Sequence, residues 1–339
     1  MNSGSMNSGS TTNDRQFPRH SRNLSPVGRP PERYDGALAP CETDRVPGPR
    51  VTLGPILLIC VAATLFGTVG TALSKAPDGT PSLSAATLRL LVGGLALAVL
   101  ARGWNLSGRW RVCLVGAAGV AVYQSMFFAA TTSTGVAMAS LVTIGASPLA
   151  SRLIALVRRR PAPPRLWWLA ATVLGVGVTV LVIGGYDDLT VEPRGLVAAV
   201  IAGVAYAAYT EAGAVLIADG VRTTTAMAAL FLGGGLLLSP TLPFLDNSWV
   251  AEGRGAVVLA YIGFVTLTLA YVAFGRGLAH LEPSTVVTLT ILEPVVAAIA
   301  STLLLDQTLR PLGWFGAALV LAGLPLVALA GSDRTAGHD

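Results

Sequence analysis

Charged residues are scarce in this chain, and those present are unevenly placed. Only 12% of the 339 residues are charged, about half the share of an ordinary soluble domain, whereas 53% are hydrophobic. Most of the charges lie in the first 50 residues or in short loops, so long stretches of chain carry none. This distribution predicts a protein that folds in a lipid bilayer rather than in water.

Lysine, cysteine and histidine are rarer still. Arginine accounts for 22 of the 23 basic residues and forms no basic helix face, which argues against nucleic-acid binding. Cys41, Cys60 and Cys113 have neither C-x-x-C nor Cys/His spacing, so we expect no disulfide framework and no metal site. No H-E-x-x-H, G-x-S-x-G or nucleotide-binding G-x-x-x-x-G-K-[ST] motif occurs. The sequence therefore predicts no catalytic residues, no cofactor and no enzymatic activity.

Long apolar spans follow a polar N-terminal segment. Residues 1–50 are rich in Ser, Pro, Gly, Asn and Arg, which predicts a disordered cytoplasmic tail. Residues 331–339 are predicted to form a second cytoplasmic tail. Each apolar span approaches the ~20 residues that a helix needs to cross a bilayer, so we predict an all-α membrane protein with ten transmembrane helices. The predicted helices cover residues 53–74, 83–101, 112–132, 136–157, 166–184, 195–218, 223–245, 256–278, 284–305 and 313–330.

The loops on the two sides of the predicted membrane differ in charge. Nine basic residues lie in the loops that follow even-numbered helices, against four in the opposite loops, where acidic residues collect. Because basic residues favour the cytoplasmic side, we expect a multi-pass protein of the cell (cytoplasmic) membrane with both termini in the cytoplasm.

The two halves of the chain match each other. At an offset of 140 residues, Phe66 aligns with Tyr206 and the glycines at 93–94 align with those at 233–234. At an offset of 146, three further pairs align: Pro148 with Pro294, Trp168 with Trp314, and Gly177 with Gly323. We predict two repeats, residues 51–185 and 192–330. Five helices per repeat place the copies in opposite orientations, and such inverted repeats are typical of transporters.

The end of the second half resembles the ten-helix EamA family of the drug/metabolite transporter superfamily. The matching segments are LEPVVAA at 292–298, LLLDQTL at 303–309, Gly316 and Gly323, and Arg89 resembles the arginine of the family's second helix. The resemblance covers about residues 51–330 and implies an exporter of amino acids or related metabolites. The first half departs from the pattern, because arginines at 158–160 stand where the family usually has an acid. Arg160 there corresponds to Asp306 in the second half.

Two prolines and one acid mark the candidate site. Pro148 and Pro294 each lie mid-span, where a missing N–H group predicts a helix break that lines the pathway, or else a packing kink. Glu293 precedes Pro294, and an ionised carboxylate at this depth is costly unless it is paired or wet. Glu293 is therefore a candidate for substrate binding or proton coupling, and the alternative is a structural acid that accepts hydrogen bonds.

Other polar side chains within the spans are further candidates. Glu211 lies about 140° from Tyr206 and 200° from Tyr209 around its helix, so either the acid or the tyrosines face the pathway, and we favour the acid. Arg89 can bind a substrate carboxylate, pair with an acid or extend to the membrane surface. Side chains that can contact a ligand on neighbouring helices are Tyr123, Gln124 and Tyr271.

Small residues recur at four-residue spacing on the fifth and tenth predicted helices. The pairs are Ala171 with Gly175 and Ala318 with Ala322, and neither helix has an ionisable residue within its span. Such faces permit close packing against the bundle or against a second protomer, which would form a homodimer. Both helices are therefore expected at the periphery.

The leading hypothesis is a secondary transporter that exports amino acids or related small metabolites by alternating access, with proton coupling at Glu293 or Glu211. Two alternatives stay open at this point. One is a facilitator or importer of another small solute. The other is a membrane scaffold or sensor without flux, which would have no central cavity.

Overall fold

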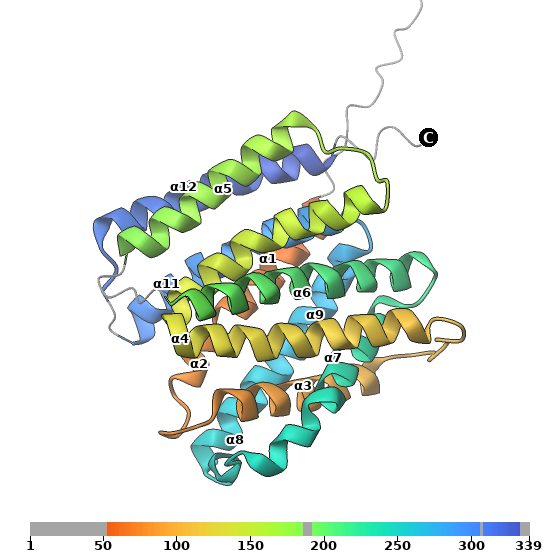
Figure 1. Ribbon diagram of the computed structural model, residues 1–339, viewed down its shortest axis with the longest axis vertical. Helices are drawn as coiled ribbons and strands as arrows, with labels where there is room; N and C mark the ends of the chain where they lie inside the picture. Colours follow the sequence, from red (N-terminus) through yellow and green to blue (C-terminus); the bar gives the residue numbers. More distant parts are fainter. Residues whose placement is uncertain (1–52, 186–191, 306–307, 333–339) are drawn as a thin grey trace, which may run out of the picture. The chain divides into compact units, whose positions relative to one another are not determined.

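The computed structural model describes residues 53–185, 192–305 and 308–332, and this part of the chain is helical, without strands (Figure 1). The predicted tail at 1–50, most of the tail at 331–339, and Asp306 lie outside the described residues. The α-helices are α1 (Leu53–Gly67), α2 (Val69–Leu73), α3 (Ser82–Leu100), α4 (Trp110–Val157), α5 (Arg165–Gly185), α6 (Pro193–Ala218), α7 (Thr223–Leu238), α8 (Gly253–Ala260), α9 (Ala270–Leu278), α10 (Pro283–Leu289), α11 (Leu292–Leu304) and α12 (Pro311–Ser332). Two short 3₁₀ helices, η1 (Ser239–Phe244) and η2 (Ser248–Val250), precede α8, and a π-helix, η3 (Tyr261–Leu269), joins α8 to α9.

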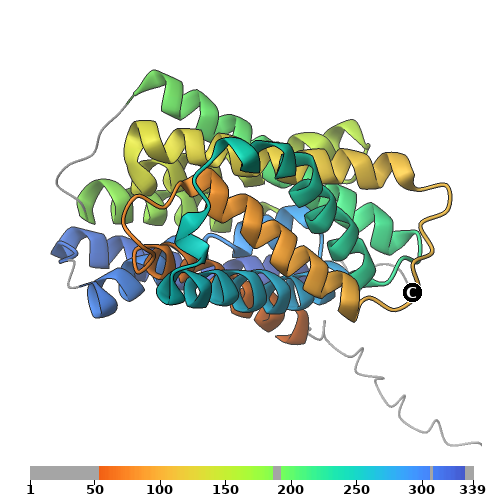
Figure 2. The ribbon, with the colours of Figure 1, turned by 90° about the horizontal axis from the view of Figure 1, so that it is seen from below.

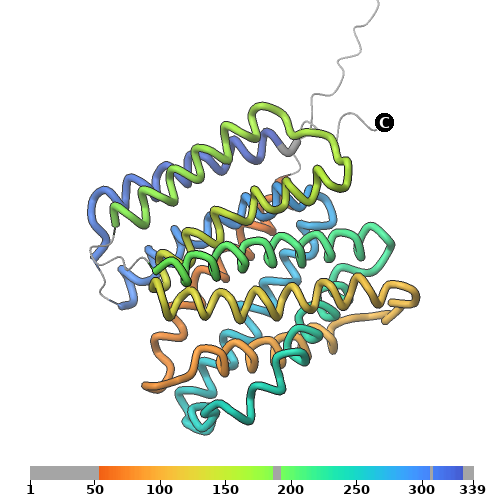
Figure 3. Tube along the Cα trace, viewed as in Figure 1, coloured from red at the N-terminus to blue at the C-terminus, as the bar shows by residue number. Residues whose placement is uncertain are grey.

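Nine helical stretches of the described residues are long and apolar enough to cross a bilayer, and one of them is long enough to cross it twice. The double stretch is α4, whose 48 residues would extend ~70 Å, about twice the hydrocarbon thickness. At Gly135 its backbone leaves the helical region with φ of 77°, a conformation that glycine adopts readily. The chain reverses there, and the two arms, 110–134 and 136–157, lie on either side of α6 (Figure 3). Counted this way, the described residues hold the ten predicted spans.

The helices form two layers. Figure 2 shows α4 and α6, in yellow and green, on one side, with α1, α9 and α11 on the other. The two most deeply buried spans are α6 and the continuous segment from α8 to α9. These two spans therefore supply much of the centre of the bundle, whereas the remaining spans expose many large apolar side chains that suit contact with lipid.

Reciprocal contacts relate the two repeats. A Cβ atom at Gly177 of α5 would lie 2.8 Å from the backbone nitrogen of Val320 in α12. A Cβ atom at Gly323 of α12 would lie 2.8 Å from the side chain of Leu174 in α5. Gly323 is the counterpart of Gly177, and Val320 is the counterpart of Leu174. The same contact therefore occurs twice, with the roles of the two repeats exchanged. This is the exchange expected across a two-fold axis.

The aligned glycines of the second and seventh spans behave in the same way. Gly93 in α3 allows the backbone of Gly263 in η3 to approach, and a Cβ atom there would lie 2.6 Å from the Gly263 oxygen. Its counterpart, Gly233 in α7, faces Ala117 in the first arm of α4. α3 in the first repeat thus contacts η3 in the second, and α7 in the second repeat contacts the first arm of α4 in the first. This exchange of partners agrees with an inverted repeat.

The fifth and tenth spans pair with each other, as Figure 1 shows for α5 and α12. Their contact uses Gly177, Gly316 and Gly323, rather than the small-residue pairs found by spacing. A Cβ atom at Gly175 would meet nothing within 4 Å, and Ala318 and Ala322 are exposed. Packing of a second protomer on this outer face stays a prediction.

Candidate functional site

The ninth span is broken at mid-length, directly before Glu293 and Pro294. α10 ends at Leu289 and α11 begins at Leu292. Pro294 has no N–H group for the carbonyl of Thr290, four residues earlier, and its ring would clash with that oxygen. The Thr290 carbonyl accepts the N–H group of Glu293 instead, at 2.9 Å. The break therefore follows from local backbone chemistry.

Pro148, the counterpart of Pro294, does not break its helix, in contrast to the prediction. The second arm of α4 runs through Pro148, and the non-helical residue of α4 is Gly135. The hydroxyl of Ser147 donates a hydrogen bond of 3.0 Å to the carbonyl of Ile144, which is the group that Pro148 leaves without an N–H donor. The side chain before the proline thus compensates in one repeat, whereas in the other repeat the helix opens.

Glu293 lies in the first turn of α11, half-buried near the centre of the bundle. The N-terminus of a helix carries a partial positive charge that favours a carboxylate. α1 passes close by, since a Cβ atom at Gly67 would lie 2.7 Å from the Glu293 carbonyl oxygen. The charge of Arg89 also acts on Glu293. Glu293 therefore lies at the start of the second segment of a discontinuous helix, and transporters form substrate sites at such helices.

Four tyrosines gather beside this break. The hydroxyl of Tyr206 in α6 donates to the hydroxyl of Thr290 at 2.9 Å, which ties α6 to the open turn. The hydroxyls of Tyr209 in α6 and Tyr271 in α9 lie 3.0 Å apart. The ring of Tyr123, on the first arm of α4, lies 5.7 Å from that of Tyr206 and 5.9 Å from that of Tyr209. The cluster joins both repeats, and it places Tyr123 and Tyr271 together as candidate ligand contacts.

Gln124 follows Tyr123 on the same arm and is buried. Its amide offers two donors and an acceptor. A buried amide of this kind can serve a polar ligand.

Arg89 contacts a widened helix turn rather than an acid. Its Nε donates to the carbonyl of Ile262 at 3.3 Å, and its Nη2 donates to that of Thr266 at 3.1 Å. Both carbonyls belong to the π-helix η3, where the wider turn alters the backbone hydrogen bonding. The hydroxyl of Thr268 adds a bond of 3.1 Å to the Gly93 carbonyl of α3. The π-helix was missed in the sequence, where only the closely spaced threonines gave a local signal.

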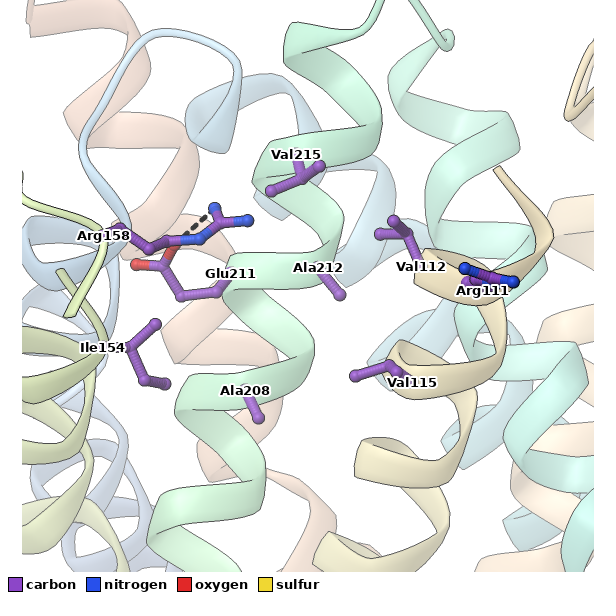
Figure 4. A pocket seen from close by; sticks show the side chains of 9 residues that line it. All are labelled: Arg111, Val112, Val115, Ile154, Arg158, Ala208, Glu211, Ala212 and Val215. Atoms are coloured by element: carbon purple, nitrogen blue, oxygen red, sulfur yellow. Dashed lines mark ion pairs between the residues drawn. The ribbon is translucent and has the colours of Figure 1, made fainter. Parts of the chain in front are cut away.

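Glu211 lies apart from the tyrosines, on another face of α6. Its side chain, 5% exposed, contacts Arg160 through both oxygens, each 3.2 Å from a guanidinium nitrogen. Arg158 lies 3.7 Å from Oε2. Sequence reasoning assigned these arginines to a loop and missed the pairing, because it joins residues about fifty positions apart. Figure 4 shows Glu211 and Arg158 at a cavity of about 310 Å³.

Metal ligands do not gather in the described part of the chain: it holds no group of three or more His, Cys, Asp or Glu side chains that could bind an ion. The chemistry of the central site is instead one carboxylate, four phenols, an amide and a nearby guanidinium. This set suits a small polar molecule that has a cationic group and an apolar or aromatic part.

Comparison with known proteins gives a family match over both repeats. The model of the EamA-like transporter family matches residues 53–183 and 193–329. An uncharacterized transporter of Bacillus subtilis, YwfM, is 30% identical over 279 residues, covering 81% of this chain and 93% of that protein. A probable terminal-alkyne amino-acid exporter of Streptantibioticus cattleyicolor is 27% identical over 272 residues, covering 77% and 87%.

A relative that matches over a shorter segment and a solved structure agree with this family match. A probable amino-acid metabolite efflux pump of Escherichia coli is 30% identical over 115 residues, which are 30% of this chain and 38% of that protein. A crystal structure with 21% sequence identity covers 83% of this chain and 98% of its own, with a TM-score of 0.69. At that identity the structural likeness concerns the fold.

Proposed function

The chain belongs to the EamA-like transporter family and is a multi-pass membrane transporter of a small molecule; from this premise we propose that it exports amino acids or related metabolites across the cytoplasmic membrane. The proposed mechanism is alternating access between the two repeats. The observation that carries the proposal is the broken ninth span, where Glu293 lies next to four tyrosines contributed by both repeats.

The proposed roles follow from the chemistry of each group. The substrate ammonium group binds the Glu293 carboxylate, and the tyrosine rings bind its apolar or aromatic part. Gln124 provides hydrogen-bond donors for the substrate carboxylate. The names of two relatives, an amino-acid exporter and an amino-acid metabolite efflux pump, support this class of substrate.

Proton coupling follows if Glu293 holds either a proton or the substrate ammonium group, but not both. A proton that enters from outside displaces the substrate, and a substrate that enters from the cytoplasm displaces the proton. This exchange exports one substrate for each proton taken up. The inward proton gradient drives exchange in this direction, and the arginine-rich loops favour a cytoplasmic location of both termini.

The test is counterflow in proteoliposomes with a panel of labelled amino acids and amines at several pH values. We expect the wild-type protein to exchange at least one amino acid with a rate that depends on pH. Glu293→Gln, which lacks the carboxylate for the substrate ammonium group, should exchange more slowly, and its remaining exchange should not depend on pH. The matched control is Glu252→Gln, which removes an exposed acid at the start of α8.

Three results would contradict parts of the proposal. Exchange of no amino acid or amine by the wild-type protein would contradict the substrate class. An active Glu293→Gln protein with unchanged pH dependence would contradict proton coupling at this residue. Faster uptake than release in vesicles of known orientation would favour the importer alternative.

A further inference from the structure

The cavity beside Glu211 is a groove between the two arms of α4, with α6 as its floor. The first arm contributes Arg111, Val112 and Val115, and the second arm contributes Ile154 and Arg158 (Figure 4). Its floor consists of four residues of α6, Ala208, Glu211, Ala212 and Val215. The lining is therefore apolar along most of its length, with basic groups on both walls.

The groove continues the stripe of α6 that faces lipid. Val197, Ile201 and Val204 are 60%, 41% and 47% exposed, and their spacing of four and three residues keeps them on one helix face. The same spacing leads on to Ala208, Glu211 and Val215, which line the groove. Tyr206 and Tyr209, at 6% and 2% exposed, lie on the buried face. The groove therefore opens toward the bilayer and not toward the tyrosine cluster.

The charges of the groove favour an anion. Its one acid, Glu211, is held by Arg160 through both oxygens, and the charge of Glu282 also acts on it. Arg158 lies farther from that carboxylate, at 3.7 Å, and its side chain is 43% exposed. Arg111 is exposed on the opposite wall. Arg111, and the part of the Arg158 guanidinium that does not face Glu211, are thus available to a ligand that enters from the bilayer.

The surroundings place this end of the groove at headgroup depth. Trp110 is 61% exposed, and its ring centroid lies 5.3 Å from the guanidinium carbon of Arg111. Tryptophan is enriched where the hydrocarbon region meets the polar headgroups. A soluble anion would explain the arginines but not the apolar walls between them.

We propose that the groove binds an anionic phospholipid, with its headgroup held by Arg111 and Arg158 and an acyl chain along Val112, Val115 and Ile154. Guanidinium groups bind phosphate through paired hydrogen bonds, and basic pockets between membrane helices are suited to anionic headgroups. The lipid contacts α4 of the first repeat and α6 of the second, so it links the repeats at a site separate from Glu293.

The experiment measures lipid binding to the full-length protein in detergent after delipidation. Phosphatidylglycerol and phosphatidylcholine with identical acyl chains are titrated, and bound lipid is counted by native mass spectrometry. We expect phosphatidylglycerol to bind about tenfold more tightly, and Arg111→Gln/Arg158→Gln to lose that preference. The matched control is Arg102→Gln/Arg165→Gln, which removes two exposed arginines outside the groove and should bind as the wild type does.

A second variant tests the apolar part without changing charge. Val115 is 61% exposed, so Val115→Trp should fold and fill the groove, which should weaken binding of phosphatidylglycerol. Equal affinity for the two lipids, or an unchanged preference in the double variant, would overturn the proposal. Competition by glycerol 3-phosphate at similar concentrations would also overturn it, in favour of a soluble anion. None of these readouts depends on transport, so they are independent of the function proposed above.

Discussion

Glu293 and Ser147 occupy matching positions in the two repeats, each directly before a proline, and use their side chains differently. Ser147 donates its hydroxyl hydrogen to the carbonyl that Pro148 leaves unpaired. At the other position, the backbone N–H of Glu293 pairs with the Thr290 carbonyl. The Glu293 side chain is therefore not used to compensate for its proline, and this asymmetry agrees with the role proposed for its carboxylate.

Arg89 offers a test at the scale of one residue. We expect Arg89→Lys to destabilise the protein by about 1.5–3 kcal/mol, because hydrogen bonds from a charged group are lost and one ammonium cannot reproduce the forked geometry at both carbonyls. Thermal unfolding measures the loss, and hydrogen exchange should be faster at residues 261–269. The matched control is Arg254→Lys at the start of α8, which is exposed. Unchanged exchange in η3 would contradict a role for Arg89 in holding this segment.

The helices themselves differ in how they depend on their neighbours. α5 and α12 are joined by close glycine contacts, whereas η3 is a wide turn whose carbonyls accept bonds from α3. The contact between α5 and α12 leaves no room for a methyl group. In η3, the carbonyls of a π-helix accept hydrogen bonds from a charged donor, and π-helical turns are often found at functional positions.

Alanine substitutions at two glycines of α5 distinguish the effect of packing on stability from the effect of helix propensity. Gly177→Ala places a methyl group 2.8 Å from the Val320 nitrogen, and we expect a loss of about 1–3 kcal/mol in unfolding free energy. Gly175→Ala meets nothing within 4 Å and should be neutral or stabilising by up to about 1 kcal/mol. Thermal unfolding of both variants in the same detergent measures the difference. Equal effects would show that α5 and α12 do not pack as described.

At the scale of the whole molecule, ion pairs among the described residues link the two repeats at the end where both arms of α4 are farthest from Gly135. Arg109 lies 3.4 Å from Asp219, and their side chains are 29% and 48% exposed. Glu211, which is buried, pairs with Arg158 and Arg160. Alternating access that opens this end has to separate these groups, and the buried pairing should oppose opening more strongly.

We expect the loss of each ion pair to lower the unfolding free energy by a different amount. Glu211→Gln leaves two arginines without their carboxylate, and we expect a loss of about 1–3 kcal/mol in unfolding free energy, reduced from a fully buried pair because the arginines are partly exposed. Asp219→Asn should have little effect, since exposed pairs are weak and screened by salt. Thermal unfolding at low and high salt compares them. A larger effect at Asp219 would contradict this ranking.

The sequence alone determined the membrane class, the ten spans and the inverted repeat. Hydropathy and helix length act within one span, so they can be recognised without knowing what packs nearby. A missing N–H group predicted a break at both prolines, and the break occurs at Pro294 but not at Pro148. The repeat could be found because both copies keep glycines and prolines at matching positions, at an offset of 140 or 146 residues. Gly177 and Gly323 of these then form reciprocal contacts.

Only the tertiary structure decided the partners of the polar groups. Arg89 reaches carbonyls more than 170 positions away, Glu211 meets Arg160 across 51 positions, and Tyr206 reaches Thr290 across 84. The unbroken helix at Pro148 likewise depends on the Ser147 rotamer and on the packing around it. Such contacts depend on how helices cross and rotate against one another, and this geometry is set by the whole bundle rather than by any local run of residues.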